Sequence, residues 1–142
     1  GGLDMGWTFY NASGQRLSSV ADKAATKAEM EAASSTTVNV TPGRTHYHPG
    51  VAKAWGVTSS GGTIESGSYN VNTYTKTGTG NYRATFVTSM SNALYSAFSA
   101  ALMDDHLSQP YLRQTGQLDI TVRNNSHGSD DEGNCFVVFG DL

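Results

Sequence analysis

The feature that most constrains this chain is a series of short segments, from residue 51 onward, in which apolar and polar residues alternate between turns rich in Gly, Asn and Ser. In Gln117–Arg123, for example, Leu118, Ile120 and Val122 occupy every second position. Because alternate side chains of a strand share one face, this pattern predicts a strand with one buried side. Several such strands predict a mainly β chain, with an antiparallel β-sandwich or jelly-roll-like domain over residues 51–142.

The segment Leu94–Met103 is the ambiguous one, since its frequent alanines also suit a helix. The turns that flank it and its internal Tyr95 and Phe98 favour a strand. Cys135–Phe139 is apolar and predicts a closing strand, in which the single cysteine is a buried thiol with no disulfide partner in the chain. The other predicted strands are Val51–Val57, with Val51, Lys53, Trp55 and Val57 on one face, and then Thr63–Glu65, Tyr69–Thr77 and Tyr82–Thr88.

The composition excludes several classes of function. Ser, Thr, Asn and Gly supply 57 of the 142 residues, whereas charged residues are only 15% and the net charge is −3. A nucleic-acid partner is not expected, because phosphate binding needs a clustered basic surface. Membrane insertion is not expected either, because the longest mostly apolar stretch, Ala93–Met103, is shorter than the roughly 20 residues that a spanning helix needs.

The first 50 residues read as a separate N-terminal module. Residues 1–20 predict a short hairpin, residues 21–33 a short helix, and residues 34–50 a connector that is partly extended. Within the helical stretch, Thr26 and Glu29 have the spacing of a capping box. The apolar side of this helix is mostly alanine, which buries little area, so we expect it to pack against a neighbour such as a symmetry copy.

Two histidines, His46 and His48, are the candidate metal ligands. In an extended segment residues i and i+2 point the same way, so both imidazoles could share one ion. One chain supplies only two ligands, whereas a trimer would supply six around its axis, which suits an octahedral transition metal. A pair of hydrogen-bonding loop histidines is the alternative that the sequence favours, and no cofactor is expected.

Catalytic patterns are weak, and we expect no enzymatic activity. Asp104-Asp105-His106 and 127–132 are acidic segments that could offer oxygen ligands to calcium. The second lacks the spacing of an EF-hand loop, and a solvated acidic loop is the favoured alternative. No G-x-S-x-G elbow occurs, and nothing places two carboxylates across a cleft for glycoside hydrolysis. The polar segments 104–111 and 123–133 instead have the Tyr, Asn and Ser content of adaptable recognition loops.

Three consecutive pieces of the chain resemble tail-fibre proteins of tailed bacteriophages. They are Ala25-Thr26-Lys27-Ala28-Glu29-Met30-Glu31-Ala32, then Val40-Thr41-Pro42-Gly43-Arg44, then His48-Pro49-Gly50-Val51-Ala52-Lys53-Ala54-Trp55. The β-rich region that follows, to about residue 103, is also similar. The resemblance implies a homotrimeric fibre with a distal β-domain, carried on a virion that assembles in the host cytoplasm and attaches to a bacterial surface.

Together, these readings predict a non-catalytic phage fibre component that binds a bacterial surface glycan or protein and contacts other virion proteins. A purely structural virion protein (head fibre or decoration protein), a carbohydrate-binding module and a glycan depolymerase are the alternatives. The expected trimer-junction residues are Ala25, Ala28, Met30, Ala32, Pro42 and Trp55. The expected receptor-contact residues are Asp104, Asp105, His106, Tyr111, Asn124, Asn125, His127, Asp130 and Asp131.

Overall fold

The computed structural model describes residues 12–13, 24–32 and 38–142. The chain divides into two compact units, Gly1–His48 and Pro49–Leu142. The predicted N-terminal hairpin lies outside the described residues, except for Ala12 and Ser13, which lie in a turn.

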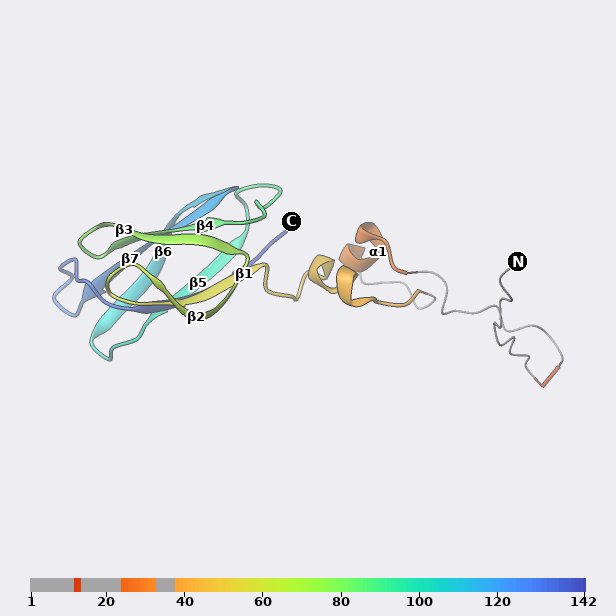
Figure 1. Ribbon diagram of the computed structural model, residues 1–142, viewed down its shortest axis with the longest axis horizontal. Coiled ribbons are helices and arrows are strands. Elements are labelled where there is room, and N and C mark those ends of the chain that lie inside the picture. Colours follow the sequence, from red (N-terminus) through yellow and green to blue (C-terminus); the bar gives the residue numbers. More distant parts are fainter. Residues whose placement is uncertain (1–11, 14–23, 33–37) are drawn as a thin grey trace. The chain divides into compact units, whose positions relative to one another are not determined.

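The larger unit consists of two four-stranded antiparallel sheets, so the prediction of a mainly β chain is confirmed (Figure 1). The first sheet has the strand order β2-β1-β8-β5 and the second has the order β3-β4-β7-β6. The strands are β1 (Ala54–Thr58), β2 (Ile64–Tyr69), β3 (Val71–Gly78), β4 (Asn81–Phe86), β5 (Ser96–Ala101), β6 (His106–Gln114), β7 (Gln117–Asn124) and β8 (Asn134–Phe139).

One core joins the two sheets. Leu118, Ile120 and Val122 of β7 are fully buried, as the alternation of the sequence predicted. The aromatic ring of Tyr74 on β3 stacks at 6.0 Å from that of Phe136 on β8, which places these aromatic residues across the sandwich. A buried polar bridge accompanies the stack, because Asn134 Nδ2 donates to Tyr74 Oη at 2.7 Å. Such a fully satisfied polar pair fixes how the two sheets are aligned.

Trp55 corrects the predicted orientation of the first strand. Ala54, Gly56 and Thr58 point into the core, while Trp55 is 40% exposed on the outer side. The small residues face inward because the opposing side is filled by a large ring: a Cβ at Gly56 would lie 3.2 Å from Phe136. Lys53, expected on the same face as Trp55, is buried just before the strand.

The strand assignment of Leu94–Met103 is confirmed by β5, although the strand is shorter than expected. The assignment of residues 104–111 as a loop is wrong, because β6 begins at His106 and only residues 104 and 105 lie in the preceding turn. Pro110 concealed this strand, since proline is depleted in sheets. It is tolerated here because β6 is an edge strand and its register with β7 shifts between Pro110 and Leu112.

The smaller unit contains helix α1 (Lys27–Ala32) and the 3₁₀-helix η2 (Pro42–Tyr47). The predicted helix therefore starts too early, since residues 24–26 are not helical. The predicted capping box is confirmed: Glu29 N donates to Thr26 Oγ1 at 3.2 Å, and Thr26 N donates to Glu29 Oε2 at 2.8 Å. This reciprocal cap ends the non-helical segment at Thr26. No helix among the described residues is long and apolar enough to span a membrane.

Candidate functional site

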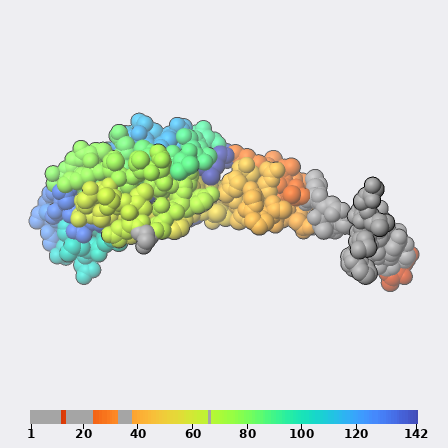
Figure 2. Space-filling view, in the orientation of Figure 1, coloured from red at the N-terminus to blue at the C-terminus, as the bar shows by residue number. Residues whose placement is uncertain are grey.

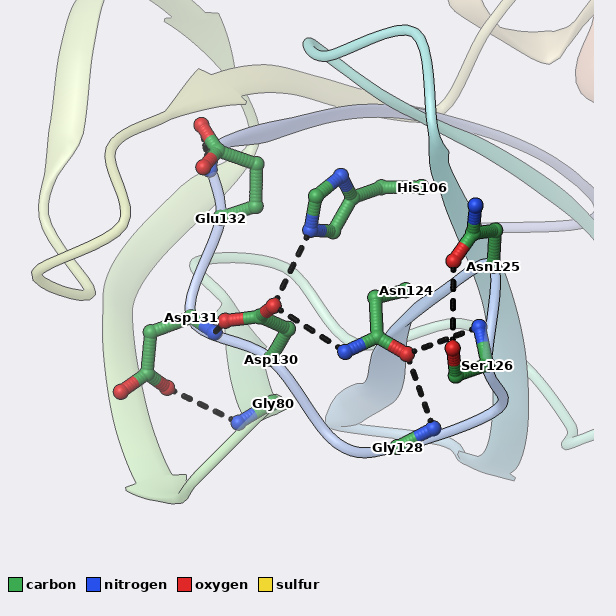
Figure 3. A network of polar contacts seen from close by, with 10 residues as sticks. Gly80, His106, Asn124, Asn125, Ser126, Gly128, Asp130, Asp131 and Glu132 are labelled. Carbon is green, nitrogen blue, oxygen red and sulfur yellow. Dashed lines mark hydrogen bonds and ion pairs between the residues drawn. The ribbon is translucent and has the colours of Figure 1, made fainter.

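The loop between β7 and β8 carries a network of polar contacts (Figure 3). Asp130 accepts from Asn124 Nδ2 at 3.4 Å, and its Oδ2 lies 3.3 Å from His106 Nε2. The side-chain oxygen of Asn124 accepts in turn from the backbone amides of Ser126 and Gly128 at 3.1 and 3.0 Å. These contacts join the start of β6, the end of β7 and the loop that follows.

Asp131 extends the network to the β3–β4 turn. Its Oδ1 accepts from the backbone amide of Gly80 at 2.9 Å, and its Oδ2 pairs with Lys76. Hydrogen bonds, first from His106, lower the pKa of Asp130, and the Lys76 ammonium, followed by the Gly80 amide, lowers that of Asp131. Both carboxylates are therefore held in their ionised form by structural partners.

The residues predicted as receptor contacts lie in several places. The structure brings together His106, Asn124, Asp130 and Asp131, and their polar groups are largely used in holding the loop. Asn125 and His127 are exposed on the loop, and Asp104 and Asp105 are exposed in the β5–β6 turn. Tyr111 lies elsewhere, on the outer face of β6, where it faces a second feature of the same sheet.

That feature is a concavity of about 330 Å³ on the outer face of the sheet β3-β4-β7-β6, called here the polar hollow. Its floor is set by strand register, because Asn81, Thr121 and Gln109 lie opposite one another on β4, β7 and β6. Thr121 is only 4% exposed, and its Oγ1 has no hydrogen-bond partner among the described residues. The lining residues are Thr77, Asn81, Gln109, Tyr111, Thr121 and Arg123.

Of these lining residues, the sequence analysis singled out only Tyr111. Thr121 belongs to a segment predicted as a strand, whereas Asn81 precedes the predicted strand Tyr82–Thr88 and is the first residue of β4. Residues of a strand that face away from the core look like any solvated strand face. Which of them meet depends on the pairing of three strands that are far apart in the sequence, and a single sequence does not specify that pairing.

The outer face of the other sheet differs in character. A row of residues crosses all four of its strands, because Trp55 pairs with both Tyr69 and Val137, and Val137 pairs with Phe98. Tyr69 is 43% and Phe98 62% exposed. A second row, Val57, Cys135 and Ala100, lies beside the first. We call these seven residues the apolar face; Cys135 is half-buried there rather than fully buried as predicted.

The strands β1 to β4, yellow to green in the space-filling view, cover much of the visible surface of the larger unit (Figure 2). The apolar face includes residues of β1 and β2, while the polar hollow lies on the sheet that contains β3 and β4. The two surfaces therefore belong to opposite layers of the sandwich.

His46 and His48 do not lie in an extended segment as expected. His46 is the fifth residue of η2, with its ring centroid 3.9 Å from that of Tyr47, and His48 follows the end of this helix. Within the described ranges, no three His, Cys, Asp or Glu side chains cluster closely enough to hold a metal ion. A metal ion bound by these histidines of several chains stays a prediction.

The residues expected at a trimer junction divide into two groups. Ala25 and Met30 are buried within the single chain. Ala28, Ala32, Pro42 and Trp55 are exposed and are therefore the ones available to a neighbouring molecule.

Comparisons of the chain with protein-family models, with curated proteins and with solved structures find no match. The two outer faces of the sandwich and the loop network between its strands are therefore the features that bear on function.

Proposed function

We propose that this chain is a non-catalytic component of a homotrimeric phage fibre that attaches to a glycan or protein on a bacterial surface. The observation that carries the proposal is the apolar face. Its central row places Tyr69, Trp55, Val137 and Phe98 side by side across four strands, with three of the four side chains well exposed.

An exposed row of this kind favours a partner, because contiguous exposed apolar patches often mark interaction sites. Neither row of the apolar face contains a charged residue. A partner surface must therefore be apolar as well, and the same face on another copy of the chain meets that requirement. Closed rotational symmetry lets three copies contribute such faces to one another without leaving any of them exposed.

The rest of the larger unit suits attachment better than catalysis. Asp119, the most buried carboxylate of the sheet β3-β4-β7-β6, accepts two hydrogen bonds from Arg83 at 2.8 Å each. Asp130 and Asp131 are likewise engaged by His106 and Lys76. A glycosidase needs one free carboxylate and one carboxyl group across a cleft. A trimer would instead gain strength by presenting three weak sites at once.

The mass of the molecule in solution tests the trimer. Sedimentation equilibrium of the full chain should give about three times the 15.0 kDa chain mass. A monomer at all concentrations would contradict the proposal, since the apolar face would then be stable in water without a partner.

Binding to cells tests attachment. The fluorescently labelled chain, added to a panel of intact bacterial strains and scored by flow cytometry, should label some strains and not others. Binding that is lost after removal of surface polysaccharide would identify a glycan receptor, and binding lost after protease treatment would identify a protein. A trimer that labels none of the strains would favour a purely structural virion protein.

A further inference from the structure

We infer that the polar hollow binds one sugar unit that bears a carboxylate, such as a hexuronic acid within a surface polysaccharide. The inference rests on the attachment role proposed above and deepens it by giving that role a site and a ligand class. The hollow's volume of about 330 Å³ lies at the lower end of the range for small-molecule sites, roughly 300 to 1,000 Å³.

Thr121 is the first reason to expect a ligand. Its hydroxyl is buried at the floor of the hollow and has no hydrogen-bond partner in the described part of the chain. A buried polar group without a partner costs about 1–3 kcal/mol, so such groups are rare unless something else completes them. A hydroxyl group of a sugar can both donate to and accept from Thr121 Oγ1.

Arg123 supplies the charge that selects an acidic ligand. It is the single charged residue in the lining. Its Nη1 donates to His127 O at 3.4 Å and to Ser129 Oγ at 3.3 Å, and no carboxylate of the described chain pairs with it. A guanidinium group binds a carboxylate through two parallel hydrogen bonds, which favours a carboxylated sugar over its neutral parent.

The remaining lining residues suit a sugar rather than a simple anion. Tyr111 is 53% exposed and offers an aromatic ring against which the apolar side of a pyranose can lie. Asn81 Nδ2 already donates to Thr79 O at 3.1 Å, which leaves its side-chain oxygen to accept from a hydroxyl. Gln109, opposite Thr121, adds an exposed amide with both donors and an acceptor.

Titration of the ¹⁵N-labelled full chain tests this directly. The probes are D-glucuronate, D-galacturonate, D-glucose and acetate, each followed through the backbone amide signals. We expect the two uronates to shift the signals of Asn81, Thr121 and Arg123, with D-glucose at least about tenfold weaker and acetate without effect. The inference is overturned if neither uronate shifts these signals, or if acetate shifts them as strongly.

Two variants locate the binding. Thr121→Val keeps the shape of the side chain and should weaken uronate binding about fivefold, the loss expected for one net hydrogen bond. Tyr111→Ala should weaken it about tenfold. Thr75→Val, on the exposed β3 strand of the same sheet and outside the hollow, is the matched control and should leave the affinity unchanged. Equal losses in Thr75→Val and Thr121→Val would contradict this location.

The cell assay separates the two proposals. One outcome is that a uronate shifts the amide signals of the polar hollow while the chain labels no bacterial strain. That result would support the site and contradict the attachment role. Labelling of cells by a chain whose hollow signals do not respond to either uronate would overturn the site and leave attachment standing.

Discussion

The two sheets of the sandwich bury similar residues and expose very different ones. The sheet β3-β4-β7-β6 presents hydroxyl, amide and guanidinium groups around the polar hollow. The sheet β2-β1-β8-β5 presents Trp55, Tyr69, Phe98 and their neighbours. Folding alone requires neither outer face to be apolar, because the shared core is already complete. The difference teaches that one layer of the sandwich exposes mainly polar groups around its concavity, whereas the other exposes a continuous apolar row, and the trimer proposed above would cover that row.

The strongest test of this contrast exchanges one exposed apolar residue on each face for a charge. Phe98 is 62% exposed on the apolar face, and Leu107 is 64% exposed on the sheet β3-β4-β7-β6. Phe98→Asp should reduce the mass in solution from three chains to one, since an isolated charge in an apolar interface is severely unfavourable. Leu107→Asp should leave the mass unchanged. Sedimentation velocity checks both, and an equal response would remove the distinction between the faces.

Two adjacent residues of β7 face opposite sides of the sheet and so allow the core to be compared with the outer face. Ile120 is fully buried in the core, so Ile120→Ala should lower the free energy of unfolding by about 2–5 kcal/mol. Thr121 points to the other side, and its hydroxyl has no partner among the described residues. Thr121→Val removes that unpaired buried group and should therefore leave the free energy of unfolding unchanged or raise it, by up to about 1–3 kcal/mol. Urea denaturation measures both variants, and a loss of stability in Thr121→Val would reveal a structural role for the hydroxyl.

The bridge between the sheets has a smaller expected effect. Tyr74→Phe removes the hydroxyl that Asn134 binds, and Asn134 is 0% exposed. Leaving that amide unsatisfied should lower the free energy of unfolding by about 1–3 kcal/mol. Tyr69→Phe, on the exposed side of the apolar face, is the matched control and should have little effect. Thermal melting of both variants decides whether the bridge contributes to stability.

The smallest expected effect is the loss of stability of the loop network in acid. The pKa values of Asp130 and Asp131 are lower in the folded chain than in the unfolded one. The stability that they contribute is therefore present above the unfolded value, about pH 4, and is lost as the pH falls through their folded pKa values. Asp130→Asn should make the melting temperature less dependent on pH in that range. An unchanged pH dependence would show that the loop does not need this ionised carboxylate.

Strands β4 and β7 were predictable because apolar residues occupy every second position in them. In β7 only Leu118, Ile120 and Val122 are large and apolar, so the inward face follows directly. In β1 the same logic fails, because the large residues Trp55 and Val57 face outward while Ala54 and Gly56 make room for Phe136. A large apolar residue therefore does not by itself mark the side of a strand that faces the core.

The candidate sites were harder to predict than the fold. The polar segment 123–133 was recognised as a loop, although its first two residues still belong to β7, and Asn124 and Asp130 do link its polar groups into one network (Figure 3). The sequence could not show that these groups would mostly satisfy one another. Nor could it show that Asn81, Thr121 and Gln109 share a row, because that follows from the pairing of β4, β7 and β6. Segment identity is a local property, whereas a site on a sheet depends on register.

Gly80 limits which substitutions are possible where the β3–β4 turn meets the β7–β8 loop. Its φ is +64°, and a Cβ there would lie 2.4 Å from the carbonyl oxygen of Val122 and 2.8 Å from the amide nitrogen of Asp130. Any other residue would push the β3–β4 turn away from the loop that it anchors. Asn125 and Ser126, beyond that anchor, carry no such restriction. Substitutions at Asn125 and Ser126 should therefore leave the contact between the β3–β4 turn and the loop intact, whereas a substitution of Gly80 should break it.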